Sequence, residues 1–204
     1  MASQPPSENY GNGDVSERHE HPQQPRRPMQ LREYFDIGLT VDAYAQLLDE
    51  DQTDLHQMYE RRACLDEDAI KVIRATGQHH ILVVTEPWCG DSLAIFPVIA
   101  KLFTAARCEV RVIRRDEHTD LIDQFLTNGG RAIPIVIILD DQFETRFHWG
   151  PRPKPAQDII MDHKAAIAAG EIDKADVHKQ VRAFYARDHG KTIVAEFAEA
   201  FSRL

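Results

Sequence analysis

The sequence has few cysteines, no long apolar run and no surplus of basic residues. Its three cysteines are an odd number, and their spacing matches neither a disulfide framework nor a zinc site. No run of eighteen apolar residues is present, so we expect no membrane helix. A net charge of -9 argues against a nucleic-acid partner, which requires a basic surface. The composition therefore predicts a globular protein without a metal, a cofactor, a nucleic acid or a membrane as partner.

The first residues, MASQPPSENY, lack the basic start and apolar core of a secretory signal, so we expect a cytoplasmic location with reduced cysteines. Residues 1–29 are rich in Pro, Gln, Ser, Asn, Glu and His and nearly devoid of apolar side chains. Such a segment cannot bury enough surface to offset its ordering entropy, which predicts a disordered tail. His19 and His21 in this tail are interpreted as solvated residues rather than metal ligands.

The rest of the sequence has helical periodicity at both ends and alternating strands and helices between them. This pattern predicts an α/β domain over residues 30–204, with N-terminal helices (30–78), a core (79–150) and C-terminal helices (151–204). The helical pattern of residues 31–76 includes Thr40 as an N-cap. The predicted strands are His80–Thr85, Glu109–Arg114, Pro134–Leu139 and Phe143–His148, and the predicted helices after the first strand are Ser92–Ala106, His118–Leu126, Pro155–Ala169, Asp173–Arg187 and Lys191–Phe201.

A lone cysteine follows the first predicted strand, in the stretch ILVVTEPWCGDSL (81–93). Cys89 falls in the first turn of the next helix, where unpaired N–H groups and the positive end of the helix dipole favour an anion. We therefore expect its thiol to ionise more readily than that of a free cysteine. Gly90 leaves the approach to the sulfur open, and Trp88 is expected to form a flat apolar wall rather than part of the core. These features predict a nucleophile that attacks disulfides or reactive sulfur species.

Two polar neighbours modify this prediction. Asp91 brings a carboxylate close to the sulfur, which opposes thiolate formation, although an acid also suits a helix N-terminus. Ser92 stands three residues after Cys89, where its hydroxyl either donates a hydrogen bond to the thiolate or caps the helix. A serine cannot form a disulfide, so a mixed disulfide on Cys89 has no neighbouring thiol to resolve it.

The stretch from His79 to about Gly150 resembles the thioredoxin-like superfamily. Trp88-Cys89-Gly90 matches the start of the Trp-Cys-Gly-Pro-Cys motif, with Asp91-Ser92 in place of the last two residues. RAIP (131–134), followed by IVIIL (135–139), matches the segment that holds a cis-proline opposite the cysteine. The segments WGPRP (149–153) and YARDHG (185–190) resemble a bacterial branch of the family with a Trp-Cys-Gly-Asp-Ser motif. The resemblance implies a thioredoxin-like three-layer fold with helical extensions at both ends.

The same resemblance implies that Ile133 and Pro134 bind substrate. A cis bond before Pro134 would turn the Ile133 backbone toward the thiol, where an extended peptide could pair with it. Typical thioredoxins also carry a buried aspartate six residues before the motif cysteine, and this sequence has Val83 there. A site without a second cysteine has no use for that proton relay, so the departure is self-consistent and argues against dithiol reduction.

We therefore expect monothiol thiol–disulfide exchange, with Cys89 and Ser92 as catalytic residues and Trp88, Gly90, Ile133 and Pro134 binding the substrate. The expected partners are protein or low-molecular-weight thiols and disulfides, and the sequence does not indicate an oligomeric state. The main alternative is a binding module or redox sensor without turnover, and a weaker one is an iron–sulfur cluster shared by two subunits. Further residues are expected to be structural: Cys64 in a helix, Cys108 at a strand start, Arg131 on the surface, His79 and His80, and Trp149 beneath the C-terminal helices.

Overall fold

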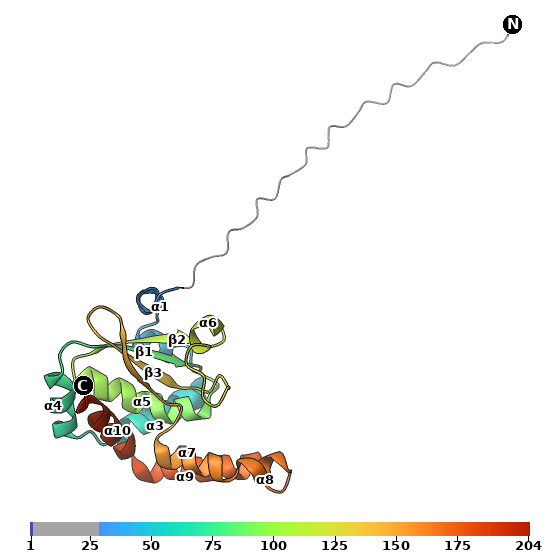
Figure 1. Cartoon of the computed structure of the whole chain (residues 1–204). Helices are drawn as coiled ribbons and strands as arrows, with labels where there is room; N and C mark the ends of the chain where they lie inside the picture. Colours follow the sequence, from blue (N-terminus) through green and yellow to red (C-terminus); the bar gives the residue numbers. More distant parts are fainter. Residues whose placement is uncertain (2–28) are drawn as a thin grey trace.

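The structure is a computed structural model that describes residue 1 and residues 29–204 (Figure 1). The predicted disordered tail, with His19 and His21, lies almost wholly outside the described residues. At the centre is a four-stranded sheet with the order β2-β1-β3-β4. Strand β1 (His80–Thr85) pairs parallel with β2 (Glu109–Arg114) and antiparallel with β3 (Ile135–Leu139). Strand β3 pairs antiparallel with β4 (Thr145–Trp149).

The helices cover both faces of this sheet (Figure 1). Side chains alternate between the faces of a strand, and both faces of the central strands are apolar here. Val83 of β1 packs in one core with the helices around α5, whereas Leu82 and Val84 pack in a second core with α1 and α6. The helices are α1 (Leu31–Ile37), α2 (Val41–Ala45), α3 (Glu50–Arg62), α4 (Glu67–Ala75), α5 (Gly90–Ala105), α6 (Thr119–Ile122), α7 (Lys154–Asp162), α8 (Lys164–Ala168), α9 (Lys174–Asp188) and α10 (Lys191–Phe201).

This arrangement confirms the predicted fold class and most of the predicted elements. The first two predicted strands and the last predicted helix have the predicted bounds, and Thr40 caps α2 by accepting a hydrogen bond from the Ala43 amide. Among the described residues, no helix is both long and apolar enough to cross a membrane.

Two predicted helices are wrong in extent. The helix predicted over His118–Leu126 is the single turn α6, because the amides of Gln124 and Phe125 bond to carbonyls three residues back and tighten the chain. The helix predicted over Pro155–Ala169 divides into α7 and α8 at His163, whose ring Nδ1 is 2.8 Å from the Ile159 carbonyl oxygen. That ring occupies the acceptor which the His163 amide would use in a continuous helix.

Trp149, at the end of β4, joins the C-terminal helices to the sheet as predicted. Its ring centroid is 5.1 Å from that of Phe197 on α10, and its indole N–H donates a 2.7 Å hydrogen bond to Glu196. The same carboxylate accepts a 2.7 Å hydrogen bond from the Lys154 amide in the first turn of α7. Glu196 therefore ties the sheet, α7 and α10 together.

Gly150 is predicted to tolerate no side chain. At its φ of +126° an added Cβ would stand 2.3 Å from the Pro134 carbonyl oxygen and 3.3 Å from the Ile135 Cα. Because these are backbone atoms, no rotamer change relieves the overlap. We expect Gly150→Ala to lower the free energy of unfolding by about 3 kcal/mol or more, measured by urea denaturation.

Gly170→Ala is the matched control for this prediction. Gly170 also has a positive φ, +73°, but nothing lies within 4 Å of its added Cβ. The control should lose only the left-handed strain of about 1–2 kcal/mol. Equal losses in the two variants would show that the close approach to Pro134 is unimportant.

Candidate functional site

Cys89 is the N-cap residue of α5, four residues after the end of β1. Its amide donates a 3.2 Å hydrogen bond to the Glu86 carbonyl, and its thiol donates a 3.6 Å hydrogen bond to the Ile133 carbonyl. The Ile133–Pro134 peptide bond is cis, as the resemblance implied. The fold therefore brings the thiol against the loop that the sequence had suggested, 44 residues further along the chain.

A cavity of about 270 Å³ gives access to this otherwise buried residue, of which 9% is exposed. Its walls come from the motif loop, the loop before Pro134, the segment after β4, and α9. An added Cβ on Gly90 would meet nothing within 4 Å, so the space beside the cysteine is open. The lining residues are Trp88, Cys89, Gly90, Asp91, Arg115, Ala132, Ile133, Arg152, His178, Val181 and Arg182.

Asp91 is held by two residues from the C-terminal part of the chain. Only 8% of this residue is exposed, and its carboxylate lies 2.5 Å from the Arg152 guanidinium. The Tyr185 hydroxyl on α9 donates a 2.8 Å hydrogen bond to the other carboxylate oxygen. The Arg152 cation therefore compensates the negative charge of Asp91 beside Cys89. The local sequence could not reveal this pairing, because the two residues are far apart in the chain.

Burial sets the protonation of two groups around this pair. Burial, with the Asp91 carboxylate next, raises the pKa of Tyr185 well above 10, so the hydroxyl stays protonated and donates to Asp91. Burial also lowers the pKa of His178 below 6.5, with Asp91 opposing the shift and Arg152 adding to it. His178 is therefore mainly neutral at pH 7.

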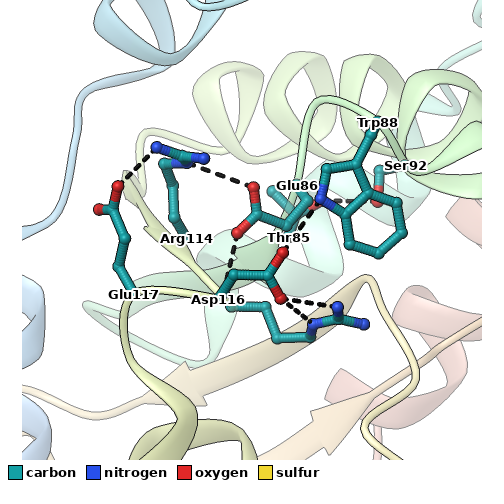
Figure 2. A network of polar contacts seen from close by, with 8 residues as sticks. Thr85, Glu86, Trp88, Ser92, Arg114, Asp116 and Glu117 are labelled. Atoms are coloured by element: carbon teal, nitrogen blue, oxygen red, sulfur yellow. Dashed lines mark hydrogen bonds and ion pairs between the residues drawn. The ribbon is translucent and has the colours of Figure 1, made fainter.

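Ser92 does not cap the helix and is bonded to the end of β1. Its hydroxyl is 1% exposed and accepts a 2.5 Å hydrogen bond from the Thr85 hydroxyl at the end of β1. The N-cap residue is Cys89, and Ser92 lies in the first turn. The capping interpretation of Ser92 is therefore wrong, and the residue forms a buried link between β1 and α5 (Figure 2). A hydrogen bond from its hydroxyl to the Cys89 thiolate stays a prediction.

Trp88 lines the cavity and is not part of the core, since 53% of it is exposed. Its indole N–H donates a 3.1 Å hydrogen bond to Asp116 (Figure 2). The Arg115 guanidinium lies 4.6 Å from the ring centroid. These contacts fix the orientation of an exposed aromatic ring, as the predicted wall requires.

Glu86 is a neighbour of the candidate site that the sequence analysis missed. This carboxylate is fully buried, lies 3.2 Å from the Arg114 guanidinium and accepts a 2.8 Å hydrogen bond from the Asp116 amide (Figure 2). It thereby positions the segment whose Asp116 holds Trp88. The only signal in the sequence is an acid directly after an apolar strand.

The other two cysteines lie away from the cavity. Cys64 is exposed and follows the end of α3, so its predicted place within a helix is wrong. Cys108 precedes β2, and burial raises the pKa of its thiol to about 11. Arg131 forms a two-pronged pair with Asp123, at 2.6 and 2.7 Å, on the surface as predicted.

Over the part of the chain that the structure describes, no group of three or more His, Cys, Asp or Glu side chains could hold a metal ion. His79 is buried, with its Nε2 2.9 Å from the Thr76 hydroxyl, and His80 stacks on Phe143 with ring centroids 4.2 Å apart. Both histidines have packing contacts, in agreement with the structural interpretation.

Comparison with known proteins gives one family and two solved structures. The thioredoxin family model matches residues 38–167. A crystal structure of an HIV epitope scaffold has a TM-score of 0.67 and 17% sequence identity, over 86% of this chain and 99% of that one. A crystal structure of a protein of unknown function from Pseudomonas aeruginosa has a TM-score of 0.61 and 20% identity, over 83% and 99% of the two chains. No curated protein matches the sequence.

Proposed function

Because this chain belongs to the thioredoxin family, we propose that it catalyses thiol–disulfide exchange through Cys89 alone. The observation that carries this proposal is a cysteine at the N-terminus of α5 that lines an open cavity and contacts the Ile133 carbonyl before a cis-proline. The position three residues later is a buried serine bonded to Thr85, so no internal disulfide can form there.

The remaining cysteines do not offer a resolving thiol. Glu109 pairs with His80 and Arg114 with Thr85, so Cys108 stands at the opposite end of the sheet from Cys89. Six strand residues separate these ends by roughly 20 Å. Cys64 bonds to the His189 carbonyl, and the adjacent Gly190 approaches Val98, about 13 Å along α5 from Cys89. The Cys108 separation exceeds the roughly 7 Å between Cα atoms that a disulfide allows, and Cys64 does not line the cavity that contains Cys89.

The proposed reaction has two exchange steps. The Cys89 thiolate attacks the sulfur of a mixed disulfide, a new sulfur–sulfur bond forms, and the substrate leaves as a thiolate that takes a proton from water. A second thiol then attacks the adduct on Cys89, which restores the cysteine and releases a small disulfide. Overall, the external thiol supplies the two electrons that reduce the substrate disulfide, and it leaves as part of the small disulfide.

The test follows both steps with one defined substrate. A peptide whose cysteine is joined to glutathione is mixed with the protein, quenched in acid and analysed by intact mass and peptide mapping. We expect one glutathione adduct on Cys89, its loss on adding glutathione, and peptide release at a rate proportional to protein concentration. A rate no higher than that of glutathione alone would contradict catalysis.

One observation favours the alternative of a binding module. Trp88 is 53% exposed yet fixed by Asp116 and Arg115, an arrangement suited to holding an aromatic contact for a partner. This alternative predicts that Trp88→Ala abolishes partner capture whereas Cys89→Ser leaves it intact. Exchange catalysis predicts instead that Cys89→Ser has a larger effect on the reaction than Trp88→Ala.

A further inference from the structure

The charges around the thiol are unbalanced. Three cationic side chains line the cavity, from Arg115, Arg152 and Arg182, against a single carboxylate, that of Asp91. His178 adds no full charge at pH 7, because burial lowers its pKa. This local excess of positive charge stands out in a chain whose net charge is -9.

Two of the three cations already have partners. Arg152 is paired with Asp91 at 2.5 Å, and Arg115 is paired with Asp116 at 2.6 Å. Within residues 29–204, the Arg182 guanidinium has neither a hydrogen bond nor an ion pair. Its charge therefore remains available to a molecule that enters the cavity.

The backbone of Arg182 is also firmly positioned. It follows Val181, which is 1% exposed, and precedes Tyr185, which anchors α9 to Asp91. Since these neighbours fix the helix on the site, Arg182 extends from a fixed backbone at the same cavity as Cys89, and its side chain stays exposed. A cleft with one sign of charge raises the local concentration of the opposite ion.

We infer that the small molecule which exchanges with Cys89 is a low-molecular-weight thiol or disulfide with a carboxylate near its sulfur, recognised by Arg182. This inference rests on the proposed function and names the substrate class of the same site. A cavity of about 270 Å³ is smaller than those that hold drug-sized ligands, so a compact acid fits it. With a disulfide, the Cys89 thiolate attacks one sulfur and forms a new sulfur–sulfur bond to that half, and the other half leaves as a thiolate that takes a proton from water. With a thiol, the thiol attacks the adduct on Cys89, which restores the cysteine and releases a small disulfide.

Three small disulfides of different charge test the inference: 3,3′-dithiodipropionate (anionic), bis(2-hydroxyethyl) disulfide (neutral) and cystamine (cationic). The rate of adduct formation on Cys89 is measured by mass spectrometry and divided by the rate of 2-mercaptoethanol with the same reagent. We expect the normalised rates to fall from anionic to neutral to cationic, with about a 10-fold preference for the anionic over the neutral reagent at low salt. Salt at a concentration of about 0.5 M should remove most of the preference for the anionic reagent.

The test variant is Arg182→Gln, and the matched control is Arg187→Gln on the same helix. Both arginines are exposed, but Arg187 does not line the cavity and bonds to the Ala183 carbonyl of its own helix. We expect Arg182→Gln to slow the anionic reagent about 3- to 5-fold and leave the neutral one unchanged, with no effect of Arg187→Gln. Equal normalised rates for all three reagents in the wild type would overturn the inference and leave the exchange function standing. No adduct on Cys89 with any reagent would overturn both.

Discussion

Cys89→Ser is expected to reduce peptide release from the glutathione mixed disulfide by a factor on the order of 10³ or more. A serine hydroxyl is not ionised at neutral pH and does not attack disulfides, so both exchange steps are lost. The substitution keeps the shape of the site, because the serine hydroxyl can also donate to the Ile133 carbonyl that now accepts from the thiol. The measurement is the release rate at equal protein concentration.

The two other cysteines provide the controls for this prediction. Cys64→Ser changes an exposed residue, and Cys108→Ala removes a thiol whose pKa of about 11 leaves only about 10⁻³ or less of it ionised at pH 7.5. Both variants should retain the wild-type rate. Loss of activity in Cys64→Ser or Cys108→Ala would mean that a distant thiol takes part, against the single-cysteine mechanism.

Arg152→Met is expected to lower the free energy of unfolding by about 3 kcal/mol, because it leaves the Asp91 carboxylate buried without a counter-charge. Asp91 is 8% exposed and the Arg152 side chain 14% exposed, so water compensates neither group. Among the residues that the structure describes, only Tyr185 still donates a side-chain hydrogen bond to this carboxylate. The uncompensated negative charge beside Cys89 should also slow its reaction with 3,3′-dithiodipropionate.

A second substitution separates the ion pair from simple loss of packing. In Asp91→Asn/Arg152→Met the buried charge is gone and the amide can still accept from Tyr185, so most of the lost stability should return. Arg131→Met is the matched surface control, since its pair with Asp123 is nearly half exposed and worth about 0–1 kcal/mol. If urea unfolding shows equal losses for Arg152→Met and Arg131→Met, the buried pair does not stabilise this site.

Local patterns predicted the parts of the site that are continuous in sequence. The apolar run before Glu86 placed β1, and Cys89 followed it at the start of α5, because strand alternation and helix periodicity are properties of neighbouring residues. The family resemblance around Pro134 predicted that the loop before this proline lies opposite Cys89. The extent of α6 and the break at His163 were wrong, because they depend on single hydrogen bonds that periodicity does not encode.

By itself the sequence determined that this chain has an α/β core with one cysteine at a strand-to-helix junction and a serine where a second thiol could have stood. The tertiary structure alone decided what surrounds that cysteine. Arg152 and Tyr185 reach Asp91 from far along the chain, Arg182 lines the cavity from α9, and Thr85 binds the serine. The physical reason is that a charge or a hydroxyl takes whichever partner packing brings within hydrogen-bond distance, and the docking of α9 onto the sheet fixes that choice.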